Sequence, residues 1–295
     1  MVYKPLINAM DRVNRNSGYI IVAVLIGIFG ISGTVDSPVQ AKEMWLQLEQ
    51  GLELGTFLSP QLSDVGDSRI HILRIDPAFF SFRLLNASAE PSGRRQGAKE
   101  WALKHNLVAT INASLYQADN KTSVSLMRTR NHVNNSHLSR DKTLLVFDSR
   151  NPSLPNAQII DRDCQDIDPI LDSYESFVQS IRMVSCKGEN VWAQQNKRWS
   201  TAAIGMDLRG RILFIHARSP YTTHDLINIL LQLPIELKSA MYTEGGPIAQ
   251  LYVRSDKQEY EFLGSYSTRS NENDNNAIAW PIPNVVGIAR IDKTK

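Results

Sequence analysis

The sequence predicts an α+β fold: a single domain of mixed, mainly antiparallel sheet flanked by helices. Short apolar runs bounded by turn residues are far more frequent than segments with helical spacing, and no internal repeat is visible. Two consecutive runs, 202–206 and 212–217, flank Asp207-Leu208-Arg209-Gly210, which is typical of a hairpin turn and therefore of antiparallel pairing. With 295 residues, 42% of them hydrophobic, the chain has enough apolar surface for a domain-sized core.

The first 41 residues have the pattern of a secretory signal. Lys4, Arg12 and Arg15 precede an uncharged apolar run at 19–31, and small and polar residues follow as far as Ala41. The run is short for a membrane span, so we expect cleavage after Ala41, with an uncleaved signal anchor that tethers the protein through 19–31 as the alternative. Either outcome places a folded domain of residues 42–295 outside the cytoplasm, as a secreted, periplasmic or membrane-anchored protein.

Each expected element has a local reason. Strands are predicted where β-branched and aromatic residues form short runs between turn residues, and helices where apolar residues recur every three or four positions. The last helix follows Thr222, with Asp225 three positions on, which resembles a capping box. The expected strands are 71–75, 79–85, 108–111, 143–147, 181–185, 202–206, 212–217, 240–243, 251–253 and 285–291, and the expected helices are 97–105, 169–179 and 224–233.

Cys164 and Cys186 flank the expected helix 169–179 and strand 181–185. A helix of about 12 residues advances roughly 18 Å, and a returning strand of about six residues covers roughly 20 Å. The second cysteine is thereby brought back beside the first, and we predict a disulfide in an oxidising compartment. Two buried thiols are the alternative. Two cysteines without a clustered histidine predict no zinc site.

Composition and motifs exclude several function classes. The net charge is only +2 and the lysines and arginines are scattered, so we expect no nucleic-acid partner. The sequence lacks the serine-hydrolase elbow, the phosphate-binding loop, the zinc-protease motif and the dinucleotide fingerprint. We expect no cofactor. The oxygen-rich run 270–276 is interpreted as a mobile loop, with Ca²⁺ binding as the weaker alternative.

Glu244 is followed by Gly245, Gly246 and Pro247 at the end of the predicted strand 240–243. Such a turn can deliver a carboxylate into a cleft and allow a ligand to approach the backbone closely. The alternative is an ordinary tight turn with a solvated glutamate.

Further polar side chains also follow predicted strands, and if these strand ends share one edge they line a cleft suited to a sugar or a phosphate. The alternatives are that Asn112 serves a turn, that His216 is a buried strand histidine and that the arginines pair with surface acids. The residues concerned are Asn112, Tyr116, Arg128, His132, Asn134, Asn135, His216 and Arg218.

Four segments, in this order, resemble the phosphodiester glycosidase family across about residues 70–290. They are 110–116 (TINASLY), 201–207 (TAAIGMD) with Gly210, 240–246 (AMYTEGG) and 282–288 (IPNVVGI). The chain departs from the family pattern at two of these segments. The family usually has Asn-Gly/Ala-Gly-Phe/Met-Phe where this chain has Asn112-Ala113-Ser114-Leu115-Tyr116, and Asp-Gly-Gly-Gly-Ser where it has Glu244-Gly245-Gly246-Pro247-Ile248.

The resemblance implies a hydrolase that cleaves a sugar-1-phosphodiester on a glycan, glycolipid or cell-envelope polymer. Phosphate is a good leaving group, so a single carboxylate suffices where most glycosidases use two. It implies a catalytic set of Glu244 as base or nucleophile, with Asn112 and His216. Substrate is then bound by Arg128 and Arg218 at the phosphate and by Tyr116, His132, Asn134, Asn135, Gly245 and Gly246. The alternative is a catalytically inactive envelope protein that binds glycan or phosphoglycan through the same cleft.

Overall fold

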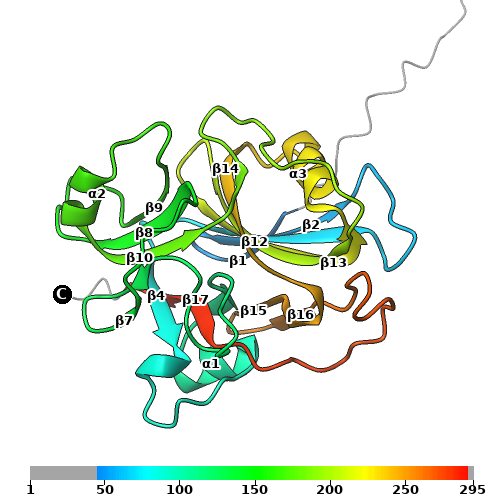
Figure 1. Ribbon diagram of the computed structural model, residues 1–295, viewed down its shortest axis with the longest axis horizontal. Coiled ribbons are helices and arrows are strands. Elements are labelled where there is room, and N and C mark those ends of the chain that lie inside the picture. Colours follow the sequence, from blue (N-terminus) through cyan, green and yellow to red (C-terminus); the bar gives the residue numbers. More distant parts are fainter. Residues whose placement is uncertain (1–44, 292–295) are drawn as a thin grey trace, which may run out of the picture. The chain divides into compact units, whose positions relative to one another are not determined.

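The computed structural model describes residues 45–291, and the expected signal segment 1–41 lies outside them. These residues form three antiparallel sheets and three α-helices, which confirms the α+β class (Figure 1). Within 45–291 no helix is long and apolar enough to cross a membrane.

The largest sheet has seven strands in the order β1-β2-β3-β13-β12-β14-β11, and every neighbouring pair is antiparallel. The predicted hairpin joins β12 to β13 through Asp207 and Gly210, with Gly210 at φ +81°. The strands are β1 Trp45–Glu49, β2 Leu52–Leu58, β3 Arg69–Ile75, β11 Arg182–Val184, β12 Trp199–Asp207, β13 Ile212–Tyr221 and β14 Leu237–Gly245.

Two five-stranded sheets complete the domain. One has the order β16-β15-β5-β17-β4 and the other β7-β6-β10-β8-β9. The first comprises β4 Phe80–Asn86, β5 Ala109–Asn112, β15 Gln250–Arg254, β16 Glu259–Leu263 and β17 Asn284–Arg290. The second comprises β6 Met127–Arg128, β7 Val133–Asn135, β8 Thr143–Ser149, β9 Ala157–Asp161 and β10 Tyr174–Ser180.

One apolar cluster is shared by all three sheets. It includes Phe214 of the seven-stranded sheet, Ile111 and Val286 of one five-stranded sheet, and Leu145 and Val178 of the other. Each sheet contributes one face to this cluster. The shared core therefore fixes the positions of the strand ends that carry the polar residues predicted to form the site.

Helix α3, Thr223–Gln232, covers the other face of the seven-stranded sheet. Its Leu226 and Leu230 pack in a second cluster with Leu213 and Ile215 of β13. The predicted cap is present: Thr222 Oγ1 accepts a hydrogen bond from the Asp225 amide at 3.0 Å. The remaining helices are α1 Ala98–Lys104, α2 Asp168–Ser173 and the one-turn 3₁₀ segments η1 Ala87–Ala89 and η2 Gly246–Ile248.

The expected helix 169–179 is wrong beyond its first turn and a half. Helix α2 ends at Ser173, and Tyr174–Ser180 forms β10 between β6 and β8. Phe177 and Val178 belong to different apolar clusters on opposite faces of the sheet. A strand that is buried on both faces has a continuous apolar run, which periodicity alone cannot distinguish from a buried helix.

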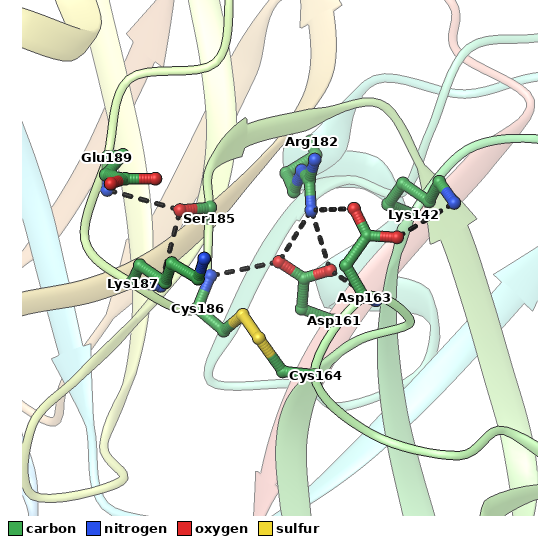
Figure 2. The surroundings of a disulfide bond; sticks show 9 residues. All are labelled: Lys142, Asp161, Asp163, Cys164, Arg182, Ser185, Cys186, Lys187 and Glu189. Carbon is green, nitrogen blue, oxygen red and sulfur yellow. Dashed lines mark hydrogen bonds and ion pairs between the residues drawn. A yellow bond between two sulfur atoms is a disulfide. The ribbon is translucent and has the colours of Figure 1, made fainter.

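The predicted disulfide between Cys164 and Cys186 is confirmed, with Cα atoms 6.6 Å apart. Figure 2 shows that it lies beside an ionic cluster: Arg182 Nη1 donates to both oxygens of buried Asp161, at 2.9 and 3.0 Å, and to Asp163 at 2.8 Å. Asp161 also accepts the Cys186 amide at 2.9 Å. The bond and the cluster together fasten the end of β9 to the end of β11.

Candidate active site

Glu244 lies near the end of β14, and the chain then turns sharply through η2 into β15. Gly246 adopts φ +69°, a left-handed conformation that disfavours side chains. A second glycine, Gly264, lies so close that a Cβ added to it would sit 2.1 Å from the Gly246 carbonyl oxygen. The tight packing of residues 244–249, the glutamate turn, therefore depends on glycine on both sides.

Asn112 supports this glutamate turn from β5 of the neighbouring sheet. Its Nδ2 donates to the Ile248 carbonyl at 2.9 Å, and its Oδ1 accepts the Gln250 amide at 2.7 Å. Both ends of the buried amide are thus used on backbone groups, which fixes the exit of the turn.

His216 supports the same turn from β13. Its Nε2 lies 3.3 Å from the Ala249 carbonyl oxygen, while its Nδ1 is buried without a hydrogen-bond partner. Burial, reinforced by the cross-strand neighbour His71, lowers the pKa of His216 to about 3. A neutral imidazole that donates from Nε2 to the carbonyl satisfies this geometry.

Arg218 holds the segment that packs against the glutamate turn. Its guanidinium donates to Asp274 Oδ1 at 2.6 Å and to the carbonyls of Leu263, Asp274 and Asn276 at 2.7, 2.9 and 3.0 Å. In the same oxygen-rich run, Asn271 donates to the Ser265 carbonyl. These side chains of 270–276 are therefore engaged with protein groups.

His216 and Arg218 line a cavity of about 290 Å³, and Asn112 and Glu244 are not among its lining residues. The four strand-end residues that were expected to line one common cleft therefore do not all face the same cavity. Asn112, His216 and Arg218 converge on the backbone of the glutamate turn, directly or through the 263–276 segment, rather than on one cavity. The cavity is lined by Asp67, His71, His216, Arg218, Glu261, Phe262, Leu263, Asn276 and Ala277.

The Glu244 carboxyl is buried, with 6% of the residue exposed. Its Oε1 accepts the Gly245 amide at 3.0 Å, but burial outweighs this bond and raises the pKa of Glu244 to about 8. The carboxyl therefore titrates close to neutral pH, as general acids and bases in enzymes do.

Two tyrosines respond to the charge of Glu244. Burial, and then the Glu244 carboxylate, raises the pKa of Tyr116, whereas the guanidinium of Arg95 lowers it. The same two causes raise the pKa of Tyr242. The Tyr242 hydroxyl packs so closely on Gly245 that a Cβ added to this glycine would lie 2.1 Å from it. Tyr242 and Gly245 thus lie close to the carboxyl. Tyr116 is half-exposed.

The remaining candidates form the framework of the 121–135 loop. Asn134 accepts the Ser123 amide at 2.7 Å and donates to Ser88 and to the Lys121 carbonyl, and Asn135 donates to the Ser123 carbonyl at 2.8 Å. His132 Nε2 lies 2.8 Å from Ser88 Oγ. All three side chains therefore have partners within the protein.

Arg128 differs from these loop residues. Its guanidinium carbon lies 4.7 Å from the centre of the Phe177 ring, and its Nε has no hydrogen-bond partner. The planar group is thus held by stacking, with a donor still unused.

Three supporting residues were not predicted. Buried Asn86 donates to Asn284 Oδ1 at 2.8 Å, and Asn284 in turn donates to the Lys121 carbonyl at 3.1 Å. Gln250 is fully buried and connects the glutamate turn to two other segments, accepting from the Ala98 amide and donating to the Trp280 carbonyl. Asn284 lay within the motif at 282–288, whereas nothing local to Gln250 indicates its role.

Comparison with known proteins agrees with the fold. The sequence model of the phosphodiester glycosidase family matches residues 105–289. No curated protein matches the chain by sequence.

Among solved structures, the catalytic domain of zebrafish N-acetylglucosamine-1-phosphodiester alpha-N-acetylglucosaminidase, auto-inhibited by its pro-peptide, aligns with a TM-score of 0.58 and 14% identity over 81% of this chain and 83% of that one. A hypothetical protein from Synechocystis aligns with a TM-score of 0.51 and 13% identity over 83% of this chain and 63% of that one. At these identities the two structures establish a shared fold, and the family match covers more than half of the chain. The protein belongs to the phosphodiester glycosidase family.

Proposed function

We propose that the protein is an exported hydrolase that cleaves the C1–O bond of a sugar-1-phosphodiester on a glycan, glycolipid or cell-envelope polymer. The observation that carries this proposal is the buried carboxyl of Glu244, which titrates near neutral pH on a turn held from two sheets. The named activity of the zebrafish enzyme, whose fold the chain shares, supports the same bond type.

Glu244 acts as the base. Hydrolysis adds the oxygen of water to C1, and the carboxylate takes the proton that this water loses. The phosphate departs with the bonding electrons and needs little protonation, so one carboxyl suffices. A pKa of about 8 makes Glu244 a stronger base than an exposed carboxylate. At one pH unit below this pKa, about a tenth of the Glu244 carboxyls are still ionised and able to act as the base.

The other candidates divide into two groups. Asn112 and His216 position the glutamate turn through the Ile248 and Ala249 carbonyls. Gly245 and Gly246 let the turn pack closely against Tyr242, Trp199 and Ser267, and their contact with substrate stays a prediction. Tyr116 contacts substrate beside Glu244. His132, Asn134 and Asn135 shape the adjoining loop.

The assignment of Arg128 and Arg218 to the substrate phosphate stays a prediction. The Nε of Arg128 is unpaired but buried, so it supplies a phosphate contact only if the groups that cover it move. Arg218 is paired with Asp274, so it supplies a phosphate contact only if that ion pair opens.

Export is supported by the disulfide, because such bonds persist in oxidising compartments. Cleavage of the signal after Ala41 and a tether through 19–31 remain the two expectations for the N-terminal segment. Recovery of the mature protein from the producing cells, followed by N-terminal sequencing, separates them.

The test of activity is incubation of the folded domain with a panel of sugar-1-phosphodiesters and cell-surface polymers, with detection of free sugar. The hydrolase predicts release that saturates with substrate. Saturable binding without release would instead support the second candidate, an inactive envelope protein that binds phosphoglycan. The Glu244 carboxyl and the Asn112 and His216 contacts that hold its turn favour the hydrolase over this second function.

A further inference from the structure

One cavity of the domain has a cationic lining and no residue in common with the glutamate turn. Its volume is about 560 Å³, and it shares no lining residue with the cavity beside His216. No aspartate or glutamate lines it. We call it the cationic hollow, and it is lined by His137, Leu138, Ser139, Arg140, Lys142 and Arg162.

The backbone on either side of Arg140 is held from two directions. The Ser139 and Asp141 carbonyls accept Arg162 Nη1 at 2.7 and 3.1 Å, and the same two carbonyls accept Gln179 Nε2 at 3.2 and 2.7 Å. Gln179 is fully buried, and its Oε1 accepts the Ser139 amide at 3.0 Å. This wall of the hollow is therefore in place before any ligand binds, which reduces the entropy that binding costs.

Two positive charges of the hollow have no carboxylate partner. Within residues 45–291, the half-buried Arg162 donates to backbone carbonyls alone, and the exposed Arg140 side chain forms no hydrogen bond or ion pair. The adjacent acid, Asp141, instead accepts the hydroxyls of Ser125 and Ser139 at 2.6 and 2.8 Å. The charges of both arginines are thus available to an anion from outside the protein.

Lys142 is the paired cation of the hollow. Its Nζ lies 2.9 Å from Asp163, which also accepts Arg182 in the ionic cluster beside the disulfide (Figure 2). Lys142 and Asp163 are both exposed, so water and salt weaken this pair. Lys142 can therefore turn toward an anion in the hollow at little cost in free energy.

The number and kind of charges indicate the class of ligand. A guanidinium binds phosphate oxygens through pairs of N–H donors, and an ammonium adds a point charge. The three cations of the hollow exceed the single negative charge of a phosphodiester, whereas a group with two or more adjacent phosphates matches them. Exposed His137 adds a further ring nitrogen at the rim.

We propose that the cationic hollow is a binding site for oligophosphate, a group of two or more adjacent phosphates, which Arg140, Arg162 and Lys142 contact. The inference goes beyond the proposed function, because no residue of the glutamate turn lines the hollow and no bond of the ligand is cleaved there. The domain then has a polyanion site in addition to its candidate active site.

The test is calorimetric titration of the folded protein with tripolyphosphate, and with dimethyl phosphate as a singly charged phosphodiester for comparison. Arg140→Gln removes an unpaired charge of the hollow, and Arg94→Gln makes the same change at an exposed arginine outside it. We expect Arg140→Gln to weaken binding of tripolyphosphate by about fivefold or more and Arg94→Gln to change it by less than about twofold. Arg140→Lys, which keeps the charge, should fall between Arg140→Gln and the unmodified protein. Thermal unfolding of each variant verifies that it is folded.

Binding of tripolyphosphate by Arg140→Gln as tightly as by the unmodified protein would overturn the proposal, as would equal losses in the Arg94 and Arg140 variants. An unmodified protein that does not bind tripolyphosphate, or that binds dimethyl phosphate equally well, would overturn it too. Vesicles of phosphatidylglycerol test a lipid surface as the source of phosphate. Retention on these vesicles without binding of tripolyphosphate would assign the hollow to a membrane and contradict the oligophosphate site.

Discussion

Asn112 and His216 hold adjacent carbonyls of one turn from two different sheets: Asn112 binds the Ile248 carbonyl and His216 the Ala249 carbonyl. Strand β5 and strand β13 are therefore coupled through the segment that carries Glu244. This arrangement fixes the carboxyl without a direct hydrogen bond to it from either residue. The first prediction follows from these contacts.

Asn112→Ala removes a donor and an acceptor and leaves the Ile248 carbonyl and the Gln250 amide unpaired in a buried site. We expect a loss of about 2–4 kcal/mol in the free energy of unfolding, since each net hydrogen bond contributes about 1 kcal/mol and an unpaired buried group costs more. Urea denaturation measures this loss. A loss below about 0.5 kcal/mol would show that the turn does not depend on Asn112.

Glu244→Gln replaces the buried carboxyl with an amide that does not ionise, so it should change how stability depends on pH. The pKa of the carboxyl is about 8 in the folded protein and near 4.5 in the unfolded chain. Between these values only the unfolded chain is ionised, so stability falls as pH rises, by at most about 1.4 kcal/mol per unit. We expect unmodified protein to lose stability from pH 5 to pH 8 relative to Glu244→Gln.

The control for this series is Glu189→Gln, which changes an exposed carboxyl. It should follow the unmodified protein at every pH. Parallel stability curves for Glu244→Gln and the unmodified protein would mean that the Glu244 pKa is not raised.

The histidine pair gives the opposite dependence on pH. Burial lowers the pKa of His71 to about 4 and that of His216 to about 3, from 6.5. The unfolded chain binds protons first as pH falls below 6.5, so stability from these groups is full above that value and is lost toward pH 4. His71→Gln should unfold at lower pH than the unmodified protein in an acid titration followed by fluorescence. Exposed His137 is the matched position, and His137→Gln should leave the acid midpoint in place.

The two cysteines of the disulfide are 22 residues apart in the sequence. Because the bond restricts the unfolded chain, its loss should lower the free energy of unfolding by about 3 kcal/mol. The double variant Cys164→Ala/Cys186→Ala and the reduced unmodified protein should show similar losses in urea denaturation. The double variant should no longer respond to reductant. Unchanged stability on reduction would show that the Arg182–Asp161 ion pairs hold this corner without the bond.

Local features were predictable from sequence, and long-range pairing was not. The cap at Thr222 and the hairpin at Gly210 depend on neighbours within four residues, and both are present. The prediction of a helix at 169–179 was wrong because β10 is buried on both faces, with Val178 in the core shared by the three sheets and Phe177 in a separate apolar cluster. The disulfide pairing was correct although this helix is mostly a strand.

The candidate site shows the same division. Glu244 and its glycines were visible as a motif, but the function of Asn112 depends on the pairing of β5 with β15 and β17. Gln250 could not be recognised as a supporting residue, because its role depends on contacts with Ala98 and Trp280, which are far from it in the sequence.

The central claim is that Glu244 is the base of a sugar-1-phosphodiester hydrolase. The most direct measurement is the pH profile of kcat/KM for release of free sugar from such a diester by the unmodified protein, Glu244→Asp and Glu244→Gln. We predict that the rate of the unmodified protein rises with pH to a plateau above about 8 and that Glu244→Gln is slower by about 100-fold or more. Glu244→Asp, which keeps a carboxylate, should be faster than Glu244→Gln. Full turnover by Glu244→Gln with an unchanged pH profile would contradict the claim.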